Sequence, residues 1–138
     1  MNSFHRGLLA ISRGRLGWRA GRMPVLELTT TGRRSGRPHA VMLTAPVHEG
    51  DTLVVVASRG GDDRHPSWFL NLQDHPEVEV VFGGRPRCSM RARVASPSER
   101  EALWTRVTAA YGGYAAYQRK TRRQIPLVLL EPAEGTHS

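Results

Sequence analysis

The feature that most limits the fold is a series of short apolar segments, separated by glycine, proline and charged turns, between Pro24 and Pro132. Their lengths and their alternating or continuous apolar patterns are typical of β-strands. The expected strands are residues 25–32, 38–50, 52–58, 78–82, 87–95 and 125–132. In the fifth, alternation predicts that the even-numbered residues from Cys88 to Val94 face inward and that the arginines between them face solvent.

Two predicted helices interrupt these strands. Pro66 suits the first position of a helix that ends before Pro76, because the residue ahead of a proline avoids helical geometry. Residues 96–110 begin with Ser96 or Ser98 as the cap and have acids in the first turn, which predicts a second helix. This order of elements predicts an α+β fold with a mainly antiparallel, barrel-like sheet rather than alternating βαβ units.

Length and composition restrict the class of protein. The 138 residues predict one domain, and an apolar fraction of 39% is enough for a core. The net charge of +8 would suit an anionic partner, but 19 of the 20 basic residues are arginine, a bias that codon usage alone can produce. The single cysteine, Cys88, excludes an intrachain disulfide and a multi-cysteine metal site and fits a reducing compartment. No apolar run approaches the ~18 residues of a membrane-spanning helix, so a cytoplasmic protein is expected.

Residues 1–23 form a segment distinct from the strand-rich domain, residues 24–138. This segment carries five arginines and no acid, interleaved with leucine, isoleucine and tryptophan. The pattern predicts a short basic amphipathic segment that could associate peripherally with an anionic membrane. Packing of the same segment against the domain is an equally good interpretation, and the sequence leaves both open.

Two loops rich in arginine and glycine are the candidate binding sites, because the motifs GxxxxGK[ST], GxGxxG and HExxH and zinc-ligand spacings are missing from the sequence. Arg33, Arg34 and Arg37 lie in a glycine-flanked turn, where guanidinium groups can bind phosphate or carboxylate through paired hydrogen bonds. Residues 58–61 (SRGG) follow a predicted strand, and the two glycines allow a ligand close to the backbone. Solvated surface turns use the same residue types, so that alternative stays open.

All the tyrosines of the chain, Tyr111, Tyr114 and Tyr117, are spaced three apart, so that on a helix they would share one face. Core packing is the usual explanation of such a stripe. However, Gly112 and Gly113 would each cost about 1 kcal/mol inside a helix. The segment is therefore expected to be a hinged lid rather than a packed helix, with phenols free to donate hydrogen bonds.

Three stretches of the sequence carry a family resemblance: LTTTGRRSGRP, VVVASRGGDDRHPSWFLNLQDHPEVEV and AAYGGYAAYQRKTRRQIPLVLLEP. Together they resemble the deazaflavin (coenzyme F420)-dependent nitroreductase family, over about Val25 to Pro132. Its members are actinobacterial split β-barrel oxidoreductases. Their coenzyme is a planar tricycle followed by a phosphate and a chain of glutamates, so the resemblance gives the clustered arginines a polyanionic ligand.

The resemblance implies roles residue by residue. The implied coenzyme-binding residues are Arg33, Arg34, Ser35, His39, Ser58, Arg59, Gly60, Gly61, Pro66, Trp68 and Asn71. The implied catalytic residues are Ser58, Tyr111, Tyr114 and Tyr117. Arginines of both loops would bind the phosphate and tail, and Ser58 and the two glycines would line the deazaflavin. Trp68 and Asn71 would shape the deazaflavin pocket, although Trp68 could equally fill the core.

The sequence departs from the family pattern at three positions. His39 stands where a further arginine is common, and a neutral histidine would weaken one anionic contact. Met42 stands where proline is common. Arg59 replaces a frequent lysine and keeps the charge. Gly112 and Gly113, between the first two tyrosines, would also loosen the lid, which leaves the electron acceptor less defined than the coenzyme.

The implied reaction is hydride transfer from the reduced deazaflavin to a quinone or a nitroaromatic compound, with menaquinone as the acceptor that the family suggests. One alternative is a split-barrel oxidoreductase that binds flavin mononucleotide, whose single phosphate needs fewer arginines. Another is a noncatalytic module that binds coenzyme or nucleic acid. Nucleic acid is disfavoured, because the arginines lie on scattered loops without interleaved aromatic residues. The oligomeric state is left open.

Overall fold

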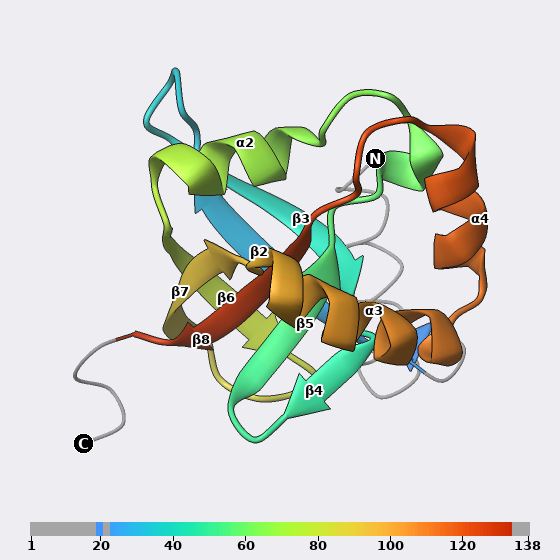
Figure 1. The fold of residues 1–138 in the computed structure, drawn as a ribbon. Coiled ribbons are helices and arrows are strands. Elements are labelled where there is room, and N and C mark those ends of the chain that lie inside the picture. Colours follow the sequence, from blue (N-terminus) through green and yellow to red (C-terminus); the bar gives the residue numbers. More distant parts are fainter. Residues whose placement is uncertain (1–18, 21–22, 134–138) are drawn as a thin grey trace.

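The computed structural model describes residues 19–20 and 23–133, and their strands form one curled antiparallel sheet with helices packed around it (Figure 1). The strands are β1 (Arg19–Ala20), β2 (Met23–Thr31), β3 (Pro38–Thr44), β4 (Val47–Glu49), β5 (Thr52–Val56), β6 (Glu77–Phe82), β7 (Cys88–Val94) and β8 (Leu127–Pro132). The helices are the short η1 (Arg59–Gly61), α2 (Ser67–Asp74), α3 (Pro97–Ala110) and α4 (Gly113–Lys120). The sheet order is β1-β2-β6-β7-β8-β5-β4, with β3 paired to β2. The α+β, barrel-like architecture expected from the sequence is confirmed.

Strand β8 is buried on both faces, which explains its continuous apolar sequence. It pairs with β5 on one side and with β7 on the other, so that Leu130 lies opposite both Leu53 and Ala92. Val128 and Leu130 belong to an inner core, whereas Leu127 and Leu129 belong to an outer core. The sheet therefore separates two apolar clusters, one inside the barrel and one beneath α3 and α4.

Helix α2 closes one end of the inner core. Pro66 is its N-cap rather than its first residue, and the helix ends before His75, as expected. Its apolar side chains Trp68, Phe69 and Leu72 are buried in the inner core. The fourth buried residue, Asn71, is polar, and it turns toward β2 and the loop that follows it.

Helix α3 begins at the predicted serine cap. Ser96 accepts a hydrogen bond from the backbone N–H of Glu99, and the Glu99 carboxylate accepts one from the backbone N–H of Ser96. This reciprocal pair satisfies two donors at the start of the helix. The pKa of Glu99 falls to about 2, chiefly because Arg93 donates to it and secondly because the Ser96 N–H does. Val107 faces the outer core.

The expectation of one strand over residues 38–50 is wrong, because the chain breaks at Ala45–Pro46. The Ala45 N–H still donates to the Pro24 carbonyl at 2.9 Å, but Pro24 has no N–H to return the bond and Pro46 has none to continue the ladder, so the β2–β3 pair ends here. The next residues form β4, which pairs with β5 and not with β3. Among the described strands, β3 therefore pairs with β2 alone and borders the opening of the barrel.

The predicted alternation in β7 holds only at its centre. Met90 and Ala92 are buried, but Cys88 and Val94 are exposed, because they lie at the ends of the strand beyond the packed inner core. The arginines of this strand and its approach face outward, as expected, and pair with carboxylates. The pairs are Arg87 with Glu27 and Glu79, Arg91 with Glu77, and Arg93 with Glu99 and Glu131.

Most of the basic amino-terminal segment, residues 1–18 and 21–22, lies outside the described residues. Of this segment the structure describes β1, whose Arg19 and Ala20 pair with the start of β2. Within the described ranges, no helix is long and apolar enough to cross a membrane.

Candidate functional site

The arginine turn, residues 32–37, forms one wall of a pocket of about 430 Å³. The pocket is lined by Thr30, Gly32, Arg33, Arg34, Ser35, His39, Ala40, Val41, Ser67, Trp68 and Asn71, and we call it the arginine pocket. The turn is closed by a hydrogen bond of 2.8 Å from the Gly32 N–H to the Arg37 carbonyl. All of these residues come from the end of β2, the turn, β3 and α2, so three elements of the fold position the pocket.

Asn71 fixes the turn to α2. Its Oδ1 accepts hydrogen bonds from the backbone N–H of Arg33 at 3.1 Å and from Nη1 of the same residue at 2.8 Å. Its Nδ2 donates to the Thr30 hydroxyl at 3.1 Å, and both side chains are buried. All of these contacts hold the Arg33 guanidinium in one place before any ligand arrives.

Arg34 is the free cation of the arginine pocket. Its side chain is exposed and makes no hydrogen bond or ion pair within the described part of the chain. Beside it, the Ser35 hydroxyl and the His39 ring lie 3.3 Å apart. None of the residues that line the pocket is acidic. The pocket thus offers positive charge and hydrogen-bond donors that suit an anion.

A second pocket, of about 550 Å³, lies farther along β3 and contains all three tyrosines. We call it the tyrosine pocket; it is lined by Met23, Met42, Leu43, Thr44, Val56, Ser58, Gly60, Ala110, Tyr111, Tyr114 and Tyr117. Ala40 and Val41 of β3 line the first pocket, and the next three residues line the second. The two pockets therefore follow one another along the same strand.

The expected hinged lid is instead a packed helix, α4. Gly112 is its N-cap and Gly113 its first residue, so neither glycine incurs the cost of a helix interior. A Cβ at Gly113 would collide with the ring of Tyr111, which lies across this position. The glycines therefore allow the α3–α4 junction to turn tightly around an aromatic ring.

Tyr114 is not free, contrary to the expectation for the phenols. It is only 6% exposed, and its hydroxyl lies 2.6 Å from the Thr44 hydroxyl at the end of β3. Burial raises the pKa of Tyr114, against a smaller opposite effect of the Thr44 hydrogen bond. The phenol stays protonated at neutral pH and is held toward β3.

Tyr111 and Tyr117 complete an edge-to-face aromatic cluster with Tyr114. The ring centroids are 5.1 Å apart for Tyr111 and Tyr114, and 6.1 to 6.3 Å apart for the other two pairs. A hydrogen bond with Tyr111 and then burial raise the pKa of Tyr117. Tyr111 is 42% exposed, so the cluster has one member at the mouth of the pocket.

The glycine loop, residues 58–62, has an unusual backbone. Arg59, Gly60 and Gly61 all have positive φ angles, of 47°, 66° and 88°. For arginine this left-handed conformation is uncommon and occurs mainly where surrounding groups enforce it. The Arg59 guanidinium pairs with Asp62 at 2.8 Å, and a Cβ at Gly61 would lie 2.8 Å from the Tyr117 carbonyl oxygen.

The structure groups the expected site residues differently from the sequence. Trp68 and Asn71 line the arginine pocket rather than the pocket of Ser58 and Gly60. The other three expected residues, which line neither pocket, are Arg59, Gly61 and Pro66. Ser58 and Gly60 are brought together with the tyrosines.

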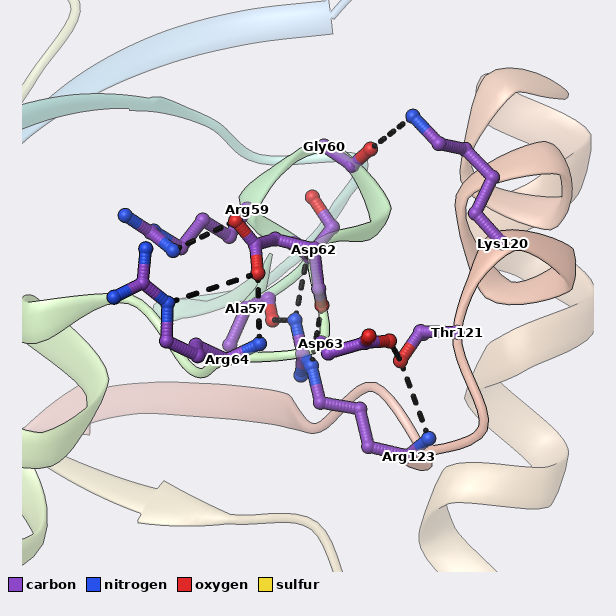
Figure 2. Close-up of polar contacts among 10 residues, drawn as sticks. Ala57, Arg59, Gly60, Asp62, Asp63, Arg64, Lys120, Thr121 and Arg123 are labelled. Atoms are coloured by element: carbon purple, nitrogen blue, oxygen red, sulfur yellow. Dashed lines mark hydrogen bonds and ion pairs between the residues drawn. The ribbon is translucent and has the colours of Figure 1, made fainter.

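Two residues that sequence reasoning missed hold these groups in place. Thr44 bonds to Tyr114, and the Arg123 side chain donates to backbone carbonyls of the glycine loop (Figure 2). Arg123 is one of several basic residues in the run RKTRR, and nothing in that run distinguishes it. Thr44 likewise has no sequence signal, because its role depends on where β3 breaks.

Comparison with known proteins identifies the family. The model of the F420H(2)-dependent quinone reductase family matches residues 5–132. An F420H(2)-dependent quinone reductase of Mycobacterium tuberculosis (strain ATCC 25618 / H37Rv) is 36% identical over 130 residues, which cover 91% of this chain and 86% of the relative. A solved F420-H2 dependent reductase is 39% identical with a TM-score of 0.70, covering 78% of this chain and 94% of that chain. A second solved structure, described as a domain-swapped dimer, is 35% identical with a TM-score of 0.73, covering 94% and 96%. The chain therefore belongs to the F420H(2)-dependent quinone reductase family.

Proposed function

We propose that the protein reduces a quinone with reduced coenzyme F420, with the anionic part of the coenzyme in the arginine pocket and the acceptor in the tyrosine pocket. As a member of the family, the protein is an oxidoreductase that depends on this coenzyme. The observation that carries the proposal is the succession of a cationic pocket and an aromatic pocket along β3. Residues 39 to 44 of a strand span roughly 17 Å, a length that suits a ligand with a flat ring at one end and charges at the other.

The residues present fit such a coenzyme. The arginine pocket combines fixed Arg33, free Arg34 and the Ser35 hydroxyl, with no acid among its described lining residues. Planar guanidinium groups bind phosphate and carboxylate oxygens in pairs of hydrogen bonds. At its other end β3 leads to Ser58 and Gly60, where a hydroxyl and an open backbone face the tyrosines.

When bound, the reduced coenzyme supplies the hydride, and this chain supplies binding, orientation and polarity. Arg33 and Arg34 bind the anionic groups and thereby fix the position of the ring along β3. Ser58 and the protonated phenol of Tyr117 donate hydrogen bonds to oxygens on which negative charge develops. Tyr114 does so when the Thr44 hydroxyl donates to it, which leaves its own proton available, and one phenol can deliver a proton to the acceptor. Apolar side chains around them exclude water from the pocket.

A quinone suits the tyrosine pocket because its walls are apolar apart from a few hydroxyl groups. Met23, Met42, Leu43 and Val56 supply flexible or flat contact surface, and methionine adapts well to planar ligands. Menaquinone is the acceptor we propose, and a nitroaromatic compound is a second acceptor class for the same pocket. A panel of both classes separates them by their kcat/KM values.

The basic segment 1–23 gives a reason for the protein to meet a lipid-soluble quinone at a membrane surface. We propose peripheral association with anionic lipid through this segment. Vesicles containing phosphatidylglycerol should retain the full chain and should retain a chain lacking residues 1–18 at least several-fold less well. Equal retention of both chains would contradict the association.

The decisive experiment mixes the purified protein with reduced coenzyme F420 and the acceptor panel. We expect the absorption of the oxidised coenzyme to return, fastest with a quinone. We also expect tighter binding of the coenzyme than of riboflavin phosphate, because the latter lacks the charged tail. No return of absorption, or a yellow protein that carries flavin as purified, would favour the flavin alternative, and capture of coenzyme without turnover would favour a noncatalytic module.

Substitution of the tyrosines tests their role in the reaction. Tyr114→Phe and Tyr117→Phe should each lower kcat by about tenfold or more, within the range typical of general acid catalysis. The affinity for the coenzyme should stay within about twofold, because the arginine pocket is unchanged. Coenzyme titration and steady-state kinetics measure the two effects, and equal losses in both would contradict the role.

A further inference from the structure

Arg123, which follows α4, sends its guanidinium group into the segment that contains the glycine loop (Figure 2). Its Nη2 donates to the carbonyls of Ala57 at 3.2 Å and Ser58 at 2.8 Å. Its Nε donates to the carbonyl of Asp62 at 2.8 Å. One side chain therefore joins the backbone at the start of the loop to the backbone at its end.

The loop that Arg123 closes is the one with three consecutive left-handed residues, beginning with the non-glycine Arg59. Such a conformation costs of order 1–3 kcal/mol at a non-glycine residue and persists only when the surroundings hold it. Among the described residues, the backbone hydrogen bonds inside the loop are short-range ones, from the Gly61 N–H to the Ser58 carbonyl and from the Asp62 N–H to the Arg59 carbonyl. The long-range support across the base of the loop comes from Arg123.

The same chain segment makes two further contacts with this region. Lys120 Nζ donates to the Gly60 carbonyl at 3.1 Å, and the Thr121 hydroxyl donates to Asp63 Oδ1 at 2.7 Å (Figure 2). The Thr121 oxygen also accepts a hydrogen bond from the Arg123 N–H at 3.3 Å. Because this segment continues directly from α4, it connects the glycine loop to the helix that carries the tyrosines.

Most of the N–H donors of Arg123 face protein atoms. Besides the three carbonyls, its Nη1 lies 3.1 Å from Nδ1 of His65, a nitrogen that can accept only while the ring is neutral. Burial and then the charge of Arg123 lower the pKa of His65. Arg123 is therefore not a binding group for the coenzyme, unlike the exposed Arg34.

We propose that Arg123 is a positioning residue, which sets the conformation of residues 58–62 and so holds Ser58 and Gly60 opposite the tyrosines across the tyrosine pocket. The inference rests on the proposed function in one respect, the use of this pocket by the reacting ring and acceptor. Arg123 does not line the pocket itself, so its loss would misplace Ser58 and Gly60 without removing a group that faces the ligand.

The test compares Arg123→Gln with Arg122→Gln, which removes the same charge one residue away. Arg122 is exposed and has no interaction within the described residues. We expect Arg123→Gln to lower kcat for a quinone by tenfold or more while the Kd for the coenzyme changes by less than threefold, since the arginine pocket stays intact. Arg122→Gln should match the wild type in both. Equal kcat values for the two variants, or equal losses of kcat and affinity in Arg123→Gln, would overturn the proposal.

Two further measurements keep the test decisive. Arg123→Lys retains the charge but cannot reach three carbonyls at once, so it should fold and still lose most of the kcat; full activity would contradict positioning by the guanidinium fork. In ligand-free protein, Arg123→Gln should shift the backbone amide signals of residues 58–62 and raise the pKa of His65 measured by NMR, whereas Arg122→Gln should do neither. If the wild type itself shows no turnover, the proposed function fails, and these ligand-free signals alone decide whether Arg123 sets the loop.

Discussion

The arginine turn and the glycine loop both combine arginine with serine and two glycines, yet the structure uses their arginines in opposite ways. In the turn, Asn71 of α2 fixes Arg33, and Arg34 has no partner within the described residues. In the loop, Arg59 is paired with Asp62, and Arg123, an arginine more than sixty positions later in the chain, holds the backbone. The arginine turn therefore leaves positive charge exposed to a ligand, whereas the arginines at the glycine loop make contacts that hold the protein backbone.

This difference shows that an arginine cluster predicts an anion site only when its charges are left unmatched. On β7 each outward arginine meets a carboxylate, and the glycine loop has Asp62 and Asp63 beside its cations. The arginine pocket, in contrast, has no acid among its described lining residues. We therefore expect the arginine turn to bind the anionic ligand and the glycine loop to position residues of the tyrosine pocket.

The largest effect is expected from the backbone of the glycine loop. Gly61→Ala should destabilise the protein by about 3 kcal/mol, because it combines a left-handed residue with a contact of 2.8 Å to the Tyr117 carbonyl oxygen. Gly36→Ala in the arginine turn has a similar positive φ but nothing within 4 Å, so about 1–2 kcal/mol is expected. Denaturant unfolding measures both. Equal costs would mean that the loop is not packed on α4 as described.

Asn71 holds the arginine turn in place through hydrogen bonds, as Arg123 does for the glycine loop. Asn71→Leu should cost about 1–3 kcal/mol, because the buried Thr30 hydroxyl and two donors of Arg33 lose their partner. Gln73→Leu, on the exposed face of the same helix, should stay within about 0.5 kcal/mol of the wild type. Denaturant unfolding of the two variants measures the difference. If Asn71→Leu lowers the free energy of unfolding no more than Gln73→Leu does, Asn71 does not hold the arginine turn on α2.

The binding contrast is tested with two charge removals. Arg34→Gln should weaken coenzyme binding about tenfold, the equivalent of one hydrogen bond to a charged group. Arg59→Gln should weaken it about threefold or less, since Asp62 already neutralises this guanidinium. Arg106→Gln on α3, which pairs with Glu49 away from both pockets, is the control for charge alone. A larger loss for Arg59→Gln than for Arg34→Gln would reverse the assignment.

The smallest effect is a pH dependence confined to His65 beside the glycine loop. Its pKa lies below the usual 6.5, because of burial and then the charge of Arg123. Between that lowered pKa and 6.5 the unfolded chain binds more protons, so the free energy of unfolding should fall as pH drops through this window and should be unaffected above it. In His65→Gln, the free energy of unfolding should no longer show this decrease between the lowered pKa and 6.5. Unfolding at pH 7.5 and 5.5 measures it, and parallel slopes would show that His65 does not contribute.

Local signals in the sequence predicted part of this molecule. The serine cap of α3, the arginine turn and the doubly buried β8 follow from spacing and composition within a few residues. The break at Ala45–Pro46 was not predicted, because the apolar alternation continues across it, whereas the missing N–H groups of Pro24 and Pro46 end the ladder. The pairing of β5 with β8 and the hydrogen bonds of Arg123 to the Ala57 and Ser58 carbonyls join residues more than sixty positions apart. No local pattern in the sequence encodes such partners.

Strand β8 joins the two parts of the sheet, and this placement has a consequence for how the protein acquires its structure. Among the described strands, β5 and β7 do not pair with each other. Strand β8, which is synthesised after both, lies between them and pairs with each. Until it docks, both strands expose unpaired backbone N–H and C=O groups that could pair with another chain. Such dependence on distant partners slows folding, so substitutions in β8 should affect yield in the cell more than they affect the finished enzyme.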